Sequence, residues 1–232
     1  MTPVRIRPIL LAALLVLAPA AAPALAEPFA VRLGMDRIVL NAPAGFSDTG
    51  DLASPRLQDL AASLTSASNR ILLFALSDAD VRRFTLGDQL DARRYMLAAV
   101  ARETERERTS AARFAELIEE TRRTLGKPAE APDLRKFLDK QPAGRPNLIA
   151  ELRRDAEAYS VLRAALVTAP EEGGYFSRER PGAYLFSTST LLLINGKVLQ
   201  LTVYAGGDFA ADPEWVKSAT ARWIEDLQRL NR

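Results

Sequence analysis

The tripeptide Asp48-Thr49-Gly50 is the first feature of this sequence that could carry chemistry. It matches the tripeptide of aspartic proteases, in which two carboxylates share a proton to activate water. In those enzymes an apolar strand precedes the tripeptide and a small residue follows it, whereas Ser47 and Asp51 flank it here. One hypothesis is therefore a carboxylate-based hydrolase that uses the acids near Asp48. The structural alternative is an Asx-type turn.

The same acids, Asp48 and Asp51, could begin a calcium loop, because Ca²⁺ binds several closely spaced oxygen ligands. No third acid or bidentate Glu stands nearby to complete such a loop. A second acidic stretch, at 103–107, alternates with arginines that neutralise it. We therefore predict no metal site and no cofactor.

The absence of histidine and cysteine excludes several familiar kinds of site. With no Cys and no His, the chain has no Cys nucleophile, no Ser-His-Asp triad and no such ligands for zinc or haem. No Ser stands three residues before any Lys, so a Ser-x-x-Lys arrangement is also missing. Catalysis would depend on carboxylates, Lys, Tyr or Ser/Thr, and the balance favours a protein that is not an enzyme.

A glycine-rich loop at 173–182 carries the residues that we select for partner binding. It presents Tyr175 and Phe176 together with Arg178 and Arg180. Aromatic and arginine side chains are enriched at the hot spots of protein interfaces. The alternative is a loop whose aromatic side chains tuck under the sheet.

Residues 1–26 have the three parts of a cleavable secretory signal peptide. Arg5 and Arg7 give the positive start, and an apolar run follows at 9–18. Small residues then lead to a cleavage site after Ala26. The run is shorter than the roughly 20 residues that span a bilayer, and there is no Cys to carry a lipid. We therefore expect a soluble periplasmic or secreted protein with no stable membrane insertion after cleavage.

The charge balance argues against nucleic acid as a partner. The chain has 31 basic and 29 acidic residues, and two of the basic ones, Arg5 and Arg7, lie in the expected signal peptide. The mature chain is then formally neutral, and its charges are interleaved. Because nucleic-acid binding depends on clustered positive charge, we expect another envelope protein as partner and no nucleic acid.

Hydrophobic periodicity predicts alternating strands and helices in the first half of the mature chain. Ser54 and Ser110 are expected to cap helices. The segment 92–125 has two interpretations, a strand followed by a helix or one long helix, and we favour the first. The predicted strands are 31–35, 37–41, 71–76 and 95–100, and the predicted helices are 55–68, 78–85 and 110–125.

The second half begins with a Pro-rich segment at 127–146, predicted to be a surface loop with one or two helical turns. Asn147 is predicted to cap a helix that carries Leu148, Leu152 and Tyr159 on one side. Asn195-Gly196 then predicts a tight hairpin between strands. The predicted hairpin strands are 183–194 and 197–204. The last helix is expected to open at Asp212-Pro213, with the acid as its cap, and to bury Trp215 and Trp223.

This order of elements resembles the Mog1/PsbP-like α/β sandwich. The resemblance is carried by the stretch 37–46 and by 191–231, where the hairpin is followed by Trp215, Trp223 and Asn231. The chain also resembles uncharacterised exported proteobacterial proteins. The resemblance implies a largely antiparallel sheet flanked by helices and a binding or accessory role, and no catalytic motif comes with it.

These observations define one α/β domain of the α+β type at 27–232, with the Pro-rich segment on its surface. We expect an exported, soluble, non-enzymatic binding or accessory protein of the bacterial envelope. The alternatives are the hydrolase described above and a small-ligand carrier. A carrier would need a large apolar pocket between sheet and helices.

Overall fold

The computed structural model describes residues 27–88, 90–167 and 184–232. The predicted signal peptide, with its cleavage site at Ala26, lies outside these residues. The strands are β1 (Phe29–Leu33), β2 (Asp36–Leu40), β3 (Phe46–Asp48), β4 (Asn69–Ser77), β5 (Arg94–Ala101), β6 (Asn147–Arg154), β7 (Ala158–Leu166), β8 (Tyr184–Ile194) and β9 (Lys197–Gly206). The helices are α1 (Pro55–Ser63), α2 (Asp78–Thr85), α3 (Ala111–Leu125), α4 (Leu134–Leu138) and α5 (Asp212–Leu230), with a 3-10 turn, η1, at Gly50–Leu52.

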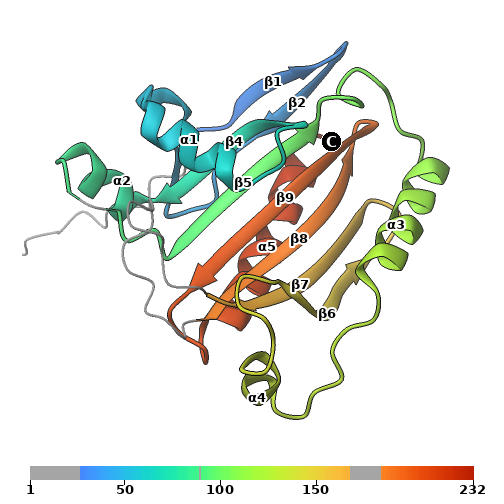
Figure 1. The fold of residues 1–232 in the computed structure, drawn as a ribbon. Helices are drawn as coiled ribbons and strands as arrows, with labels where there is room; N and C mark the ends of the chain where they lie inside the picture. The colour runs from blue at the N-terminus through green and yellow to red at the C-terminus, as the bar shows by residue number, and fades with distance from the viewer. Residues whose placement is uncertain (1–26, 89, 168–183) are drawn as a thin grey trace, which may run out of the picture.

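Seven of the described strands form one antiparallel sheet in the order β3-β4-β5-β9-β8-β7-β6. The strands β1 and β2 form a separate hairpin. In Figure 1 helix α5 lies behind β8 and β9, whereas α1 and α3 lie at opposite sides of the other face. The predicted fold class, a largely antiparallel sheet flanked by helices, is confirmed.

The face behind the sheet carries the main core. Trp223 of α5 is fully buried, and its indole Nε1 donates to the carbonyl oxygen of Asn41 at 3.0 Å. Asn231, just after α5, donates from Nδ2 to the carbonyl oxygen of Val39, and its Oδ1 accepts from the N–H of Val39, both at 2.8 Å. These bonds tie the end of α5 to β2.

The opposite face of the sheet is covered in two separate places. Leu57 and Leu60 of α1 pack with Phe74 and Leu97 over β4 and β5. The second cluster is formed by Phe114 and Ile118 of α3 with Tyr159 and Val161 of β7. Among the described residues no helix covers the face of β8 and β9 between these two clusters, and this face is called the open face below (Figure 1).

Several of the predicted elements are confirmed. The segment 95–100 lies in β5, a central strand with both faces buried, and a separate helix, α3, follows it. Asn195 and Gly196 have φ values of 50° and 77°, as a two-residue hairpin turn requires. The Pro-rich segment contains one short helix, α4.

The helix predicted after Asn147 is wrong, because this segment forms the β6–β7 hairpin. Leu148, Leu152 and Tyr159 fit a helical stripe, but the side chains of β7 alternate between the two faces of the sheet. Asp155 makes the turn, since its Oδ1 accepts from the N–H groups of Glu157 (2.9 Å) and Ala158 (2.7 Å). Asp is a preferred turn residue for this reason.

Two details of the last helix also need correction. Its cap position is Ala211, and Asp212 is the first helical residue, with a buried carboxylate that accepts from the N–H of Asp208 at 2.8 Å. Trp215 is half-buried and packs against the main core without belonging to its fully buried residues. Its ring lies 5.9 Å from that of Phe46 and 4.4 Å from the guanidinium carbon of Arg94.

None of the helices in the described part of the chain combines the length and apolar character needed to cross a membrane.

Candidate functional site

The predicted hydrolase tripeptide lies where β3 meets β4. Oδ1 of Asp48 accepts from the N–H of Phe74 at 3.2 Å, while Thr49 donates to the carbonyl oxygen of Phe74 from both N–H (2.8 Å) and Oγ1 (2.9 Å). Burial raises the pKa of Asp48, although hydrogen bonds from the N–H groups of Phe74, Gly50 and Thr49 oppose the rise. Asp51 is exposed on η1. The tripeptide therefore has a structural task, which is to join the end of β3 to β4.

The residues selected for partner binding, Tyr175, Phe176, Arg178 and Arg180, lie outside the described residues. That prediction stays a prediction.

A cavity of about 380 Å³, lined by acidic and basic residues, lies at the end of the sheet where β5 and β9 meet the start of α5. Its two buried acids already have partners. Asp80 accepts from the hydroxyl of Ser77 (2.7 Å) and the N–H of Asp91 (3.2 Å), and Asp212 pairs with Arg94 at 3.1 Å. Within the described ranges, no cluster of three or more acids is placed to hold a metal ion. This cavity is a satisfied structural network.

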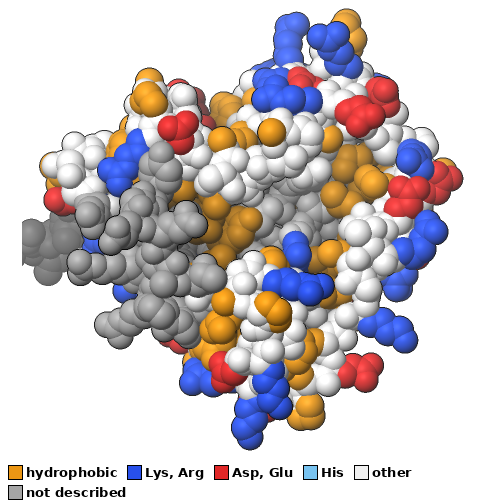
Figure 2. Space-filling view, in the orientation of Figure 1, with side chains coloured by type: hydrophobic (Ala, Val, Ile, Leu, Met, Phe, Trp, Pro, Cys, Tyr) orange, Lys and Arg blue, Asp and Glu red, His pale blue; other side chains and the backbone are white. Residues whose placement is uncertain are grey.

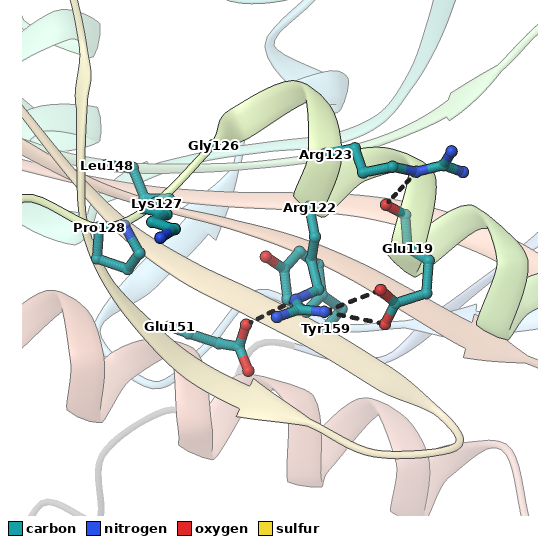
Figure 3. A pocket seen from close by; sticks show the side chains of 9 residues that line it. All are labelled: Glu119, Arg122, Arg123, Gly126, Lys127, Pro128, Leu148, Glu151 and Tyr159. Atoms are coloured by element: carbon teal, nitrogen blue, oxygen red, sulfur yellow. Dashed lines mark hydrogen bonds and ion pairs between the residues drawn. The ribbon is translucent and has the colours of Figure 1, made fainter.

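A second charged cavity, of about 310 Å³, lies between the end of α3 and β6. Figure 3 shows Arg122 between Glu119 and Glu151 and over Tyr159, and the nitrogen–oxygen distances to the two acids are 2.8 Å and 3.2 Å. Arg154 pairs with the same two acids at 3.6 Å and 3.2 Å. Burial, and secondarily the charge of Glu151, raises the pKa of Tyr159. These two acids and two arginines form a network that attaches α3 to the edge strand. Arg123 and Lys127 also line the cavity and form no ion pair with a described residue.

The third region is a groove on the open face. It consists of two cavities of about 160 and 390 Å³ that share Thr121, Leu191 and Gln200. Figure 2 shows this side of the molecule hollowed between the α1 and α3 sides. We call it the open-face groove. Its described lining includes Leu117, Thr121 and Leu125 of α3, Val161 of β7, Ser189 and Leu191 of β8, and Val198, Gln200 and Thr202 of β9.

The floor of the open-face groove is polar, and much of it is unpaired. Ser189 lies directly opposite Thr202, and the next pair along the same face is Ser187 with Tyr204. In the described part of the chain, the hydroxyls of Ser187, Ser189 and Thr202 have no hydrogen-bond partner. Hydroxyl groups on the floor of a groove are therefore free to bind a ligand.

Arg163 of β7 lies on the same face of the sheet, beside the groove and outside its described lining. It lies directly opposite Ser187 and two residues beyond Val161, so it faces the same side of the sheet. Its Nε is buried and has no hydrogen-bond partner, and it forms no ion pair with a described residue. A buried polar group without a partner costs free energy.

Tyr204 places this arginine beside an aromatic row. The ring of Tyr204 stacks on that of Tyr95 with centroids 4.5 Å apart, and Tyr95 meets Phe74 edge-on at 6.4 Å. Burial raises the pKa of Tyr204, and the nearby charge of Arg163 opposes the rise. Aromatic surface and hydroxyls without a partner among the described residues thus share the open face with Arg163, whose buried Nε has no hydrogen-bond partner.

Sequence reasoning missed this groove, although two signals were present. Arg163 is the one charged residue within the apolar strand β7. Ser187, Ser189, Gln200 and Thr202 occupy alternate positions of the two hairpin strands, as expected of one face of a sheet. The sequence alone did not show that helices leave this face uncovered.

No protein-family model and no curated protein sequence matches this chain. Among solved structures, the chain is similar to the Saccharomyces cerevisiae Ran-binding protein Mog1p. The two are 10% identical, the match covers 88% of this chain and 94% of that chain, and the TM-score is 0.40. This is a similarity of fold alone.

Proposed function

We propose that this chain is an exported, non-enzymatic binding or accessory protein of the bacterial envelope, and that the open-face groove binds part of a partner protein. The unpaired floor carries the proposal. Ser189 and Thr202 line the groove, and their hydroxyls have no hydrogen-bond partner among the described residues. Polar groups held in a groove by a rigid sheet are suited to fixing a ligand's orientation.

The composition of the groove favours binding over catalysis. Its smaller cavity is lined by hydroxyl, amide and apolar side chains, with no described carboxylate or lysine that could act as a general base. The larger cavity has one described carboxylate, the exposed Glu107. The Asp48 carboxylate is held by backbone N–H groups in the link to β4, so no observation favours the hydrolase. The cavities described above are open grooves, and no observation favours the small-ligand carrier either.

Photocrosslinking in cells tests the proposed function. In one variant a photoreactive amino acid replaces Gln200 in the groove, and in another it replaces Arg222 on the exposed side of α5. Cell fractionation then shows which compartment contains the mature protein. We expect a periplasmic protein that crosslinks to a distinct partner from position 200 and not from position 222.

A groove-blocking variant, Ser189→Arg, serves as the control for specificity. It should abolish the crosslink from position 200 and leave the melting temperature close to that of Ser218→Arg, a matched change on the exposed side of α5. Equal crosslinking from positions 200 and 222, or a crosslink that survives Ser189→Arg, would refute binding through the groove. A cytoplasmic full-length product would refute export.

A further inference from the structure

The β1–β2 hairpin has one strand edge whose backbone groups are not paired within the described part of the chain. We propose that this edge, formed by β1, adds an extended acidic segment of a partner protein as a further strand, with acidic side chains beside Arg32 and Arg37. The site is separate from the open-face groove, because no hairpin residue lines either of its cavities. Two independent observations carry the proposal, the free backbone groups of β1 and the opposed arginines.

The hydrogen bonds of Val39 show which backbone groups of β1 point outward. Residues opposite each other in an antiparallel pair alternate between pairs that exchange both hydrogen bonds and pairs that exchange none. Val39 lies opposite Ala30, and its N–H and carbonyl oxygen are both bound by the side chain of Asn231. This pair is therefore of the second kind, and the N–H and C=O of Ala30 point away from β2.

Arg32, two residues further along β1, has the same orientation. Its carbonyl oxygen accepts from Nη1 of Arg70 at 3.3 Å, on the side away from β2. Within the described part of the chain, neither its N–H nor the N–H and C=O of Ala30 has a hydrogen-bond partner. The register of β1 is regular, whereas the sheet edge at β6 has two irregularities, which are a device that blunts an edge. The three free groups of β1 are therefore suited to strand addition.

The side chains beside this edge are two arginines without an acid. Arg32 and Arg37 lie directly opposite each other, so both side chains leave the same face of the hairpin, and both residues are exposed. Neither forms an ion pair with a described residue. Like charges directly opposite each other on paired strands are destabilising, whereas opposite charges stabilise the pairing. An acidic side chain on an added strand would therefore relieve the repulsion between the two arginines.

The loop after β5 lies against the hairpin turn and is mixed in charge. A Cβ atom at Gly34 would lie only 3.0 Å from Cα of Arg106, which is exposed and forms no ion pair with a described residue. Glu103 and Glu107 of the same loop are also exposed. Figure 2 shows Lys and Arg side chains at the tip of the hairpin, at the top of the view. Because the loop carries both signs, the arginine pair on the hairpin sets the preference for an acid.

An extended polypeptide fits this edge better than another anion. The five residues of β1 span roughly 17 Å at about 3.3 Å per residue. An extended backbone presents a donor and an acceptor at the same two-residue spacing as the outward groups of Ala30 and Arg32. A lipid headgroup or a nucleic acid would meet only the arginines and would leave the free groups of β1 unused.

Selection from a random dodecapeptide phage library on the immobilised mature chain tests the proposal. We expect the selected peptides to be enriched in Asp and Glu. Fluorescence anisotropy then measures binding of a synthetic selected peptide and of two versions methylated on alternate backbone nitrogens. One version should bind about tenfold more weakly and the other should bind almost unchanged, because only one of the two alternating sets of N–H groups faces β1.

Two protein variants locate the peptide on the hairpin. Arg37→Glu places an acid opposite Arg32, so it should weaken the peptide about fivefold or more, with a melting temperature at or above that of the natural chain. Ala30→Pro removes an outward donor and should also weaken binding. Arg222→Glu, the same change on the exposed side of α5, should leave binding unaltered.

The remaining outcomes would overturn the proposal. Equal effects of the two methylated sets would refute strand addition, and peptides that lack acids or ignore Arg37→Glu would refute the acidic preference. Loss of binding with Ser189→Arg, which blocks the groove, would place the peptide in the groove instead. No selected peptide, with phosphatidylglycerol vesicles that bind the natural chain and not Arg37→Glu, would assign the arginines to an anionic lipid surface. Melting temperatures check that each variant is folded, and the methylated peptides test strand addition without any change to the protein.

Discussion

Lys197 Nζ lies 3.4 Å from a carboxylate oxygen of Asp36, and the lysine side chain is only 1% exposed. The same Nζ donates to the carbonyl oxygens of Glu105 (3.1 Å) and Glu107 (2.6 Å). One ammonium group thus joins the start of β9, the β1–β2 hairpin and the loop after β5. Arg108 reaches the same Asp36 from the exposed side at 3.2 Å.

Replacing this lysine should destabilise the fold. Lys197→Met keeps the length of the side chain but leaves two carbonyl oxygens and part of the Asp36 charge without a partner. We expect a loss of about 3 kcal/mol in the free energy of unfolding, measured by urea denaturation. Lys217→Met removes a more exposed i,i+3 pair on α5 and should cost about 0.5 kcal/mol or less. Similar losses for both variants would contradict a special role for Lys197.

The raised pKa of Asp48 predicts a loss of stability as the pH rises. Burial makes the folded state favour the protonated acid, so the folded protein binds this proton more tightly than the unfolded chain. Stability should therefore fall from the ordinary carboxyl pKa of about 4 upward, through the folded pKa. Asp48→Asn should remove this fall, as melting temperatures across this pH range would show. Asp59→Asn, an exposed change on α1, should leave the profile unaltered.

The turn acid Asp155 predicts the opposite dependence on pH. Burial alone would raise its pKa, but hydrogen bonds from Arg153 and from the N–H groups of Glu157 and Ala158 outweigh this effect and lower it. The stabilising contribution is then complete above about pH 4 and is lost as the pH falls through the folded pKa. Asp155→Asn should be less stable than the natural chain at neutral pH and should lose less stability in acid. The exposed Asp88→Asn should track the natural chain, and an equal acid response of the two variants would count against the prediction.

Local signals in the sequence were sufficient for the elements with strong turn or cap chemistry. Asn195-Gly196 specifies its hairpin because both residues must take positive φ, and Ser110 caps α3 by accepting from the N–H of Arg113. The segment 147–166 was misread because apolar residues at helical spacing also fit alternating strands, and only tertiary packing separates the two.

The candidate site was beyond sequence reasoning for a different reason. Its residues come from β7, β8, β9 and α3, and none of the four segments carries a recognisable motif. What makes Arg163 notable is a missing partner, which depends on where every neighbouring side chain lies. Pairing across a sheet is a non-local property, so neither the free hydroxyls among the described residues nor the unpartnered Nε of Arg163 could be inferred from spacing.

The bonds between Asn231 and Val39 join residues almost two hundred positions apart, and β9 must enter between β5 and β8 before the sheet is continuous. The core consequently cannot close until nearly all of this sequence has been synthesised. Contacts of such long range form slowly. A chain that stays unfolded until its last helix has been synthesised can pass through a protein-conducting channel before it folds. The topology is thus compatible with the proposed route out of the cytoplasm.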